Sequence, residues 1–220
     1  PYSSLAVYAG PTSPSSTELS VEAVGETTAT VTAGQMVSVW IHPRDDIGNP
    51  QDYVLAGADA FALTLTGPAR VPPPRVYRLF DGDGLAYYYA EFAPTVSGVY
   101  AVGGMLTNRA HASQTALAAI GTVTVLTGAA SRKFTRATGA GLTRAFAAEP
   151  SGFAVSLFDE HANAIVDTVG GYEVAFQLDN RERAEFSIAP TSLTLKEETS
   201  FPYFEARYAT SAAGTYDVRV

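Results

Sequence analysis

One strand-turn-strand pattern occurs twice in this chain, first in residues 81–102 and again in residues 201–220. Superposing Gly98 on Gly214 places aromatic residues on aromatic residues and valine on valine. The matched pairs are Tyr88/Phe204, Phe92/Tyr208, Tyr100/Tyr216 and Val102/Val218. Chains with internal repeats stack structural units instead of building one large pocket. The pattern therefore predicts a scaffold or a binding surface before it predicts an enzyme.

A cluster of turn-forming residues also has a counterpart in the second half. With an offset of 114 residues, Asp45 falls on Asp159 and Asn49 falls on Asn163. Asp, Asn, Gly and Pro favour turns because they accept or fix the backbone angles that a chain reversal requires. The two copies therefore match over most of their length and not only in their last strands.

The opening residues match the end of the first copy, with Val7 falling on Val125. We therefore expect residues 1–16 to be the last strand of a preceding repeat plus a linker. Residues 17–128 are expected to form a first repeat, and residues 129–220 a second repeat that lacks its final strand.

Composition and periodicity favour strands. Short runs rich in Val, Thr, Tyr and Phe lie between 13 prolines and 19 glycines, and 46% of the residues are hydrophobic. Alternation such as that of Val37, Val39 and Ile41 is typical of a half-buried strand. Each copy holds about seven such runs over about 110 residues, the spacing of an immunoglobulin-like sandwich. We therefore predict an all-β chain of tandem immunoglobulin-like β-sandwiches.

The net charge and the lack of cysteine limit the classes of partner and the compartment that the sequence favours. A net charge of −8 argues against nucleic acid. No apolar run approaches the roughly 20 residues that span a bilayer, so we expect no direct membrane insertion in this segment. The chain has no cysteine, and no asparagine begins a glycosylation sequon. Both features favour a reducing compartment, with other proteins and neighbouring repeats as partners.

The residues that could carry chemistry are better explained as structural. Asp81 and Asp83 resemble the start of a calcium loop, but Phe92 stands at the twelfth position, where a glutamate is needed. Asp45 and Asp46 could hold a calcium ion between repeats, although a solvated turn is the favoured interpretation. We therefore predict no catalytic residue, no cofactor and no metal site. The histidines also stand singly, at His42, His111 and His161.

Several motifs together resemble the filamin-type immunoglobulin repeat. They are AEP at residues 148–150, the run from Phe153 to Asp159 with the Asn163 turn, DGDGLAY at 81–87, and PTVSGVY at 94–100. The second copy departs from the pattern, because KEETS at 196–200 replaces the D-G-D-G hairpin and alanines flank Asn163. The resemblance covers nearly the whole chain and implies the same sandwich fold.

The resemblance also implies a partner-docking groove between the third and fourth strands of each repeat. An exposed sheet edge can accept an added strand from a partner. The alternative is that the apolar members of the set are ordinary core. The residues that would border the groove are Phe61, Leu63, Leu65, Val76 and Arg78 in the first copy, and Tyr172, Val174, Phe176, Ala184 and Phe186 in the second.

Tyr100 and Tyr216 each follow a glycine by two residues, and this spacing is typical of a tyrosine corner. In that arrangement the ring is buried and the hydroxyl bonds to the backbone of a nearby connection. We therefore predict a structural role for both tyrosines.

The function that these features favour is a non-catalytic structural and interaction module. It would belong to a longer filamin-like array in a cytoplasmic, cytoskeletal or ciliary scaffold and would dock partners through sheet edges. The alternative is an extracellular adhesion ectodomain of the gamete-adhesion type, located at the cell surface.

Overall fold

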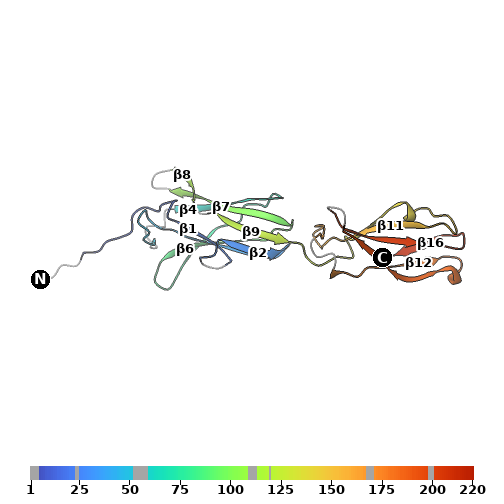
Figure 1. Cartoon of the computed structure of the whole chain (residues 1–220). Helices are drawn as coiled ribbons and strands as arrows, with labels where there is room; N and C mark the ends of the chain where they lie inside the picture. The colour runs from blue at the N-terminus through green and yellow to red at the C-terminus, as the bar shows by residue number, and fades with distance from the viewer. Residues whose placement is uncertain are drawn as a thin grey trace. The chain divides into compact units, whose positions relative to one another are not determined.

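The protein is described by a computed structural model, which covers residues 5–22, 25–51, 59–108, 113–118, 120–166, 171–197 and 201–220. The chain divides into two compact units, unit 1 (Pro1–Leu126) and unit 2 (Thr127–Val220). Almost all regular structure in both units is β, which confirms the predicted all-β class (Figure 1). No helix in the described part of the chain is long and apolar enough to cross a membrane.

Unit 1 is a sandwich of two sheets. One sheet has the order β1-β3-β6-β5, and the other has the order β2-β9-β7-β4 with β8 added to β7. All pairings are antiparallel except that of β2 with β9. The strands are β1 (Glu18–Val21), β2 (Thr28–Thr32), β3 (Val37–His42), β4 (Asp59–Thr66), β5 (Tyr77–Phe80), β6 (Ala86–Phe92), β7 (Gly98–Asn108), β8 (Ser113–Ala116) and β9 (Gly121–Leu126).

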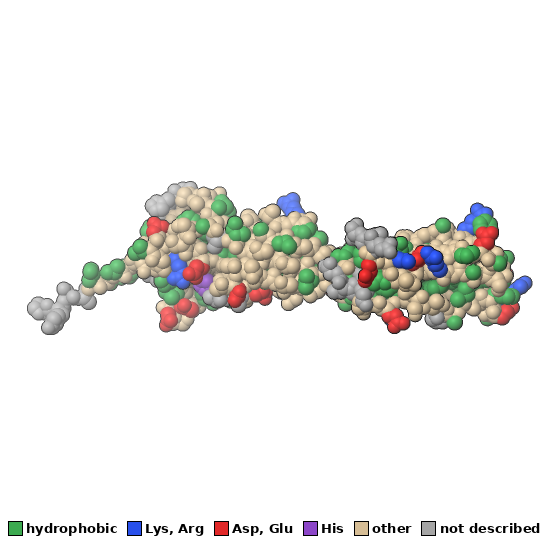
Figure 2. All heavy atoms as spheres, in the orientation of Figure 1, with side chains coloured by type: hydrophobic (Ala, Val, Ile, Leu, Met, Phe, Trp, Pro, Cys, Tyr) green, Lys and Arg blue, Asp and Glu red, His purple; other side chains and the backbone are tan. Residues whose placement is uncertain are grey.

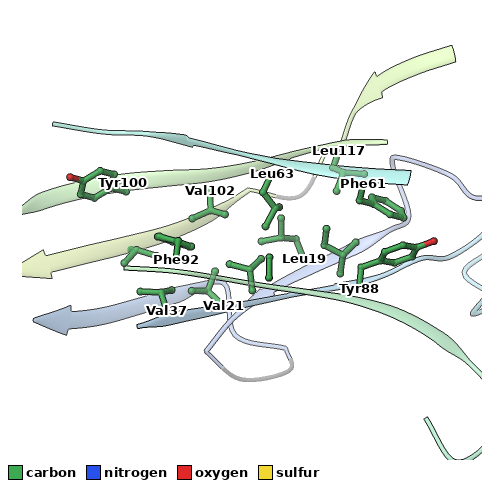
Figure 3. Close-up of a cluster of buried hydrophobic side chains, with 14 of the residues drawn as sticks. Leu19, Val21, Val37, Phe61, Leu63, Tyr88, Phe92, Tyr100, Val102 and Leu117 are labelled. Atoms are coloured by element: carbon green, nitrogen blue, oxygen red, sulfur yellow. The ribbon is translucent and has the colours of Figure 1, made fainter. Parts of the chain in front are cut away.

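The core of unit 1 lies between these sheets because successive side chains of a strand point to opposite faces. In β3, Val37, Val39 and Ile41 are buried, whereas the residues between them are partly exposed. Figure 3 shows side chains from both sheets pointing toward one another, with Tyr100 at one end of the cluster and Tyr88 at the other. The alternation read from the sequence therefore identified the inward face correctly.

Unit 2 has the same kind of layers with fewer strands in the second sheet. Its sheets have the orders β10-β11-β15-β14 and β13-β12-β16. The strands are β10 (Arg136–Thr138), β11 (Ser151–Ser156), β12 (Ala175–Asn180), β13 (Ile188–Ser192), β14 (Thr194–Lys196), β15 (Tyr203–Tyr208) and β16 (Tyr216–Arg219). The core forms around Val155, Phe176 and Phe204.

The structure differs from the sequence analysis at three places. Ala184 and Phe186, expected on a strand that borders the groove, lie in a 3-10 helix, η4 (Ala184–Phe186), because the Phe186 and Ser187 N–H groups donate to carbonyls three residues earlier. The sequence analysis also missed β2 and β8, which are rich in Thr, Ser and Ala and are mostly exposed. Short polar runs of this kind have little hydrophobic alternation for a sequence argument to use.

Residues 5–16 belong to the segment that was expected to be the last strand of a preceding repeat plus a linker. Within the described residues, 5–10 form no strand, and Leu5 and Val7 are exposed because no neighbouring strand pairs with them. Residues 12 and 13 are not a free linker: Thr12 and Ser13 are buried, and the Ser13 N–H donates to the Arg44 carbonyl at 2.7 Å. Residues 12 and 13 therefore pack on unit 1.

A buried carboxylate fixes the turn after β3. Asp45 Oδ1 accepts hydrogen bonds from the N–H groups of Ile47 (3.1 Å) and Asn49 (2.8 Å). Its Oδ2 accepts from the Asn49 side chain (2.8 Å) and from the Gly10 N–H (2.9 Å). The predicted solvated turn is therefore wrong for Asp45, which is buried, and correct for the exposed Asp46. We call this arrangement the carboxylate lock.

Unit 2 contains the same lock, bond for bond. Asp159 Oδ1 accepts from the N–H groups of His161 (2.9 Å) and Asn163 (2.8 Å). Its Oδ2 accepts from the Asn163 side chain (2.8 Å) and from the Gly128 N–H (2.9 Å). Each lock therefore ties the turn after a core strand to the segment that precedes the first strand of the same unit.

The locks lower the pKa of both carboxyl groups. The hydrogen bond from the Asn49 side chain, with those from three N–H groups, lowers the pKa of Asp45 to about 2 against the opposing effect of burial. Burial alone would raise the pKa of Asp159, but the hydrogen bonds from Asn163, Gly128 and His161 outweigh it and lower that pKa. Both carboxylates therefore stay ionised at neutral pH.

We predict that Asp45→Asn lowers the melting temperature of unit 1 at neutral pH, because an amide cannot accept from all four donors of the lock. The pKa of Asp45 is lower in the folded state than in the unfolded state, so its contribution to stability is complete above about pH 4 and is lost as the pH falls to about 2. The variant should therefore lose less stability than the wild type over that range in thermal unfolding. Asp46→Asn, which removes an exposed neighbouring charge, should follow the wild type. Parallel pH profiles for wild type and Asp45→Asn would contradict the lock.

Candidate functional site

Both predicted tyrosine corners have the expected hydrogen bond. The Tyr100 hydroxyl donates to the Val96 carbonyl at 3.0 Å, and the Tyr216 hydroxyl donates to the Ala212 carbonyl at 3.1 Å. Tyr100 is fully buried, and a Cβ atom at Gly67 would lie 2.3 Å from its ring. Gly67 therefore leaves the space that the Tyr100 ring occupies, a role that the sequence analysis did not assign.

We predict that Tyr100→Phe destabilises unit 1 by on the order of 1 kcal/mol, because the hydrogen bond from the fully buried Tyr100 to the Val96 carbonyl is lost. Tyr216→Phe should cost less in unit 2, because Tyr216 is only half-buried and water can replace its hydroxyl. Urea unfolding of each variant measures the difference. Equal effects, or none, would show that the hydroxyls do not contribute as their burial implies.

In unit 1, the predicted groove residues divide between core and edge. Phe61 and Leu63 are buried and belong to the core cluster, so for these two the core alternative is correct. Leu65 and Val76 are partly buried against the same cluster. Arg78 lies exposed on β5, which is the edge strand of its sheet. Side chains of β4 therefore do not line a groove, although both β4 and β5 end their sheets.

In unit 2, the predicted groove is closed. The edge of β12 that was expected to be open pairs with β13, and Phe176 is buried in the core. Tyr172 and Val174 precede β12 and pack against the core, and the Tyr172 hydroxyl accepts from the Ala130 N–H at 3.1 Å. Phe186 lies in η4 under the Arg183 guanidinium. Tyr172, Val174 and Phe176 therefore belong to the core of unit 2 or pack against it.

β5 is an exposed edge strand of unit 1. Every residue of β5 is exposed, and Tyr77, Leu79 and Phe80 retain 47%, 38% and 40% of their accessible surface. β5 pairs with β6 on one side, and no other described strand pairs with it. Open edges are usually protected by charge or by proline, because unpaired N–H and C=O groups attract other strands. An edge strand with three exposed apolar side chains is therefore a candidate docking site.

An aromatic surface adjoins this edge. Trp40 of β3 lies between Tyr87 and Tyr89 of β6, with ring centroids 5.6 Å and 4.4 Å away. Tyr89 is opposite Tyr77 and Tyr87 is opposite Leu79 in the β5–β6 pairing. We call the five residues Trp40, Tyr77, Leu79, Tyr87 and Tyr89 the aromatic face. The sequence analysis missed this face, although Trp40 alternates with the core residues Val39 and Ile41 and must therefore point outward.

A hollow of about 350 Å³ lies at one end of the aromatic face, lined by Trp40, His42, Arg44, Asp81 and Tyr87 among others. His42 Nε2 is buried there and has no hydrogen-bond partner within the described residues. Burial, which is the largest influence, lowers the pKa of His42, so the ring is neutral at pH 7. The hollow therefore combines stacked rings with a polar atom that a bound group could satisfy.

Asp81 and Asp83 form the hairpin predicted between β5 and β6. Asp81 Oδ1 accepts from the N–H groups of Asp83 (3.0 Å) and Leu85 (2.8 Å), and Gly84 has a positive φ of 81°. Asp81 therefore serves the turn itself. Among the described residues, no group of three or more His, Cys, Asp or Glu side chains could hold a metal ion.

We predict that calcium does not raise the melting temperature of the chain, because the Asp81 oxygen that faces the turn already accepts two N–H groups. Differential scanning calorimetry with calcium and with chelator is the measurement. A calcium-dependent rise that disappears in the Asp81→Asn, Asp83→Asn double variant would show that the turn binds the ion.

Charged side chains are dispersed on the visible surface. On the face drawn in Figure 2, Lys and Arg lie among Asp and Glu, and neither sign forms an extended patch. Along the chain, Arg75 and Arg78 stand just before and within β5, and Asp81 and Asp83 follow it. Arg75 lies over the Tyr77 ring at 5.0 Å, and Arg78 lies over the Phe80 ring at 5.6 Å.

Among known proteins, only solved structures are similar to this chain. No protein-family model and no curated protein matches the sequence. Yersinia pseudotuberculosis InvD is 12% identical, with a TM-score of 0.43 over 97% of this chain and 58% of the InvD chain. Domains 5–6 of the S-layer protein SbsC are 12% identical, with a TM-score of 0.29 over 91% of this chain and 88% of the SbsC chain. The C-terminal domain of the Streptococcus agalactiae AgI/II polypeptide BspA is 8% identical, with a TM-score of 0.31 over 92% of this chain and 88% of the BspA chain. The chain therefore spans little more than half of InvD.

Proposed function

We propose that the chain is a non-catalytic structural and interaction module that docks an extended segment of a partner protein on β5 of unit 1. The module would be part of a longer filamin-like array in a cytoskeletal or ciliary scaffold, the role that its sequence motifs imply. The observation that carries the docking proposal is the open, apolar edge of β5 beside the aromatic face.

The edge would supply affinity through the main chain. A strand added to β5 would exchange N–H···O=C bonds with it, as in other cases of β-strand addition. Its side chains would then alternate between the two faces of the sheet. On the outer face they would lie beside Tyr77 and Leu79, and on the inner face beside Arg78 and Phe80.

The aromatic face would supply selectivity. Tyr, Trp and Arg are enriched where binding energy concentrates in protein interfaces, because they bury large rigid surfaces and still form polar contacts. Trp40, Tyr87 and Tyr89 are already held against one another by their ring contacts. The arginines near the edge favour acidic side chains in the partner. The partner segment would therefore alternate apolar residues with Asp or Glu.

We predict that peptides selected from a random library on the full chain share this alternation and bind less tightly to the Leu79→Glu variant, by about tenfold or more. Leu79→Glu places a charge in the centre of the proposed interface at an exposed position, so unit 1 should remain folded. Titration calorimetry gives the affinities, and amide hydrogen exchange should slow in β5 when the peptide binds.

Val99→Glu is the matched control. Val99 is an exposed apolar residue of β7, which lies in the other sheet of unit 1 and pairs with neither β5 nor β6. This variant should bind the selected peptides as the wild type does. Peptides that bind Leu79→Glu normally, or that slow exchange only outside β5, would contradict the proposal.

A further inference from the structure

Unit 1 carries outward rings that the sandwich fold does not require. The two locks align β3 of unit 1 with β11 of unit 2 at an offset of 114 residues. On this alignment, Trp40 corresponds to Ala154 and His42 corresponds to Ser156. Unit 2 therefore builds the equivalent sheet with two small side chains at these outward positions. The large rings of unit 1 need an explanation other than the fold.

These rings line the hollow of about 350 Å³ at one end of the aromatic face. Trp40, His42 and Tyr87 all contribute to its wall. The Tyr87 ring centroid lies 5.6 Å from that of Trp40 and 6.1 Å from that of His42, with an angle of 25° between the Tyr87 and His42 planes. All three residues are half-buried, so part of each is accessible. Flat rings of this kind suit a ligand that presents an apolar face.

The remainder of the wall is held in place by the backbone. Pro43, Arg44 and Pro50, at the two ends of the turn that the carboxylate lock fixes, line the hollow together with Ala86 of β6. The Gln51 N–H donates to the Pro43 carbonyl at 3.0 Å, and the Ala86 N–H donates to the Gln51 carbonyl at 3.0 Å. These bonds join the turn to β6. The hollow is therefore formed before a ligand arrives, which lowers the entropic cost of binding.

The charges around the hollow favour a neutral ligand over an anion. Arg44 forms an ion pair with Glu18 at 2.9 Å, and its Nη1 donates to the Gly48 carbonyl at 2.9 Å. Its guanidinium is therefore already engaged. Asp81, which also lines the hollow, adds a negative charge that would repel an anion.

Two polar groups of the wall suit hydroxyl groups. Asp81 is exposed and uses Oδ1 for its own turn, so Oδ2 can accept from a ligand hydroxyl. His42 Nε2 has no hydrogen-bond partner in the described part of the chain. A hydroxyl both donates and accepts, so it can satisfy this nitrogen in either tautomer of the ring. The ligand that fits these groups combines an apolar face with hydroxyl groups at its edge.

We propose that the hollow binds a neutral sugar, the pyranose ring of a glycan. The C–H groups on one face of the ring pack on Trp40 and Tyr87, and hydroxyl groups at its edge bond to Asp81 and His42. No residue of β5 belongs to the described wall of the hollow. The inference therefore does not rest on the docking proposed for β5.

The test is fluorescence titration of the full chain, because Trp40 is its one tryptophan and lines the hollow. The probes are the methyl glycosides and the disaccharides of glucose, galactose, mannose and N-acetylglucosamine, with methyl glucuronide as a charged comparison. At least one neutral sugar should change the Trp40 emission, with a dissociation constant on the order of 1 mM or lower. Tyr87→Ser should weaken that binding by about tenfold or more, whereas Tyr87→Phe, which keeps the ring, should bind as the wild type does.

Tyr77→Ser is the matched control. It removes an exposed ring from the same outer face of the sheet, but Tyr77 does not line the hollow. This variant should bind the sugar as the wild type does. In amide NMR spectra of the wild type, the sugar should shift signals of β3, β6 and the Asp81 hairpin and leave those of unit 2 unchanged.

The proposal is overturned if no neutral sugar changes the Trp40 emission, or if Tyr87→Ser binds as tightly as the wild type. Equal losses in Tyr87→Ser and Tyr77→Ser would show that the hollow is not the site. Tighter binding of methyl glucuronide than of every neutral sugar would contradict the assignment of a neutral ligand. Leu79→Glu lies outside the hollow and should leave sugar binding unchanged, so failure of the docking proposal for β5 and failure of this one are distinguishable.

Discussion

Each unit depends on a carboxylate that is removed from water and surrounded by four N–H donors. Burying an ionised carboxyl group is costly unless hydrogen bonds replace its water. Asp45 and Asp159 meet that condition with two turn N–H groups, one asparagine side chain and one glycine N–H from a segment more than 30 residues away. Each lock thus joins two parts of the chain, the turn after a core strand and the segment before the first strand of the unit. It also fixes where the segment before each unit must lie.

The described strands of the two units differ beside the tyrosine corner. In unit 1, β9 pairs with both β2 and β7, and Tyr100 and Val102 of β7 are fully buried. Unit 2 keeps the lock, the tyrosine corner and two sheets, and its residues 140–142 form a 3-10 turn, η2 (Ala140–Leu142). The two units therefore build the same lock and the same corner on different numbers of described strands.

The sequence predicted the sandwich class, the hairpin at Asp81 and the matching turns at Asp45 and Asp159, because alternation and turn chemistry are local properties. It could not assign Phe61 and Leu63 to the core rather than to a groove, since alternation separates two faces without showing which is covered. The buried state of Asp45 depends on Gly10, 35 residues away, and no local pattern reveals such a donor. The alternation of β3 showed that the Trp40 side chain points outward. Its contacts with Tyr87 and Tyr89 could not be predicted, because they depend on which strand pairs with β3.

Amide hydrogen exchange at Gly10 and Gly128, followed by NMR, tests the lock most directly. Both N–H groups are donors to buried carboxylates, so both should exchange much more slowly than the amides of an unpaired segment. Replacing Asp45 by Ala should release Gly10 and leave Gly128 protected, because each lock lies within its own unit. Rapid exchange at both glycines in the wild type, or loss of protection at Gly128 in the Asp45 variant, would contradict this account.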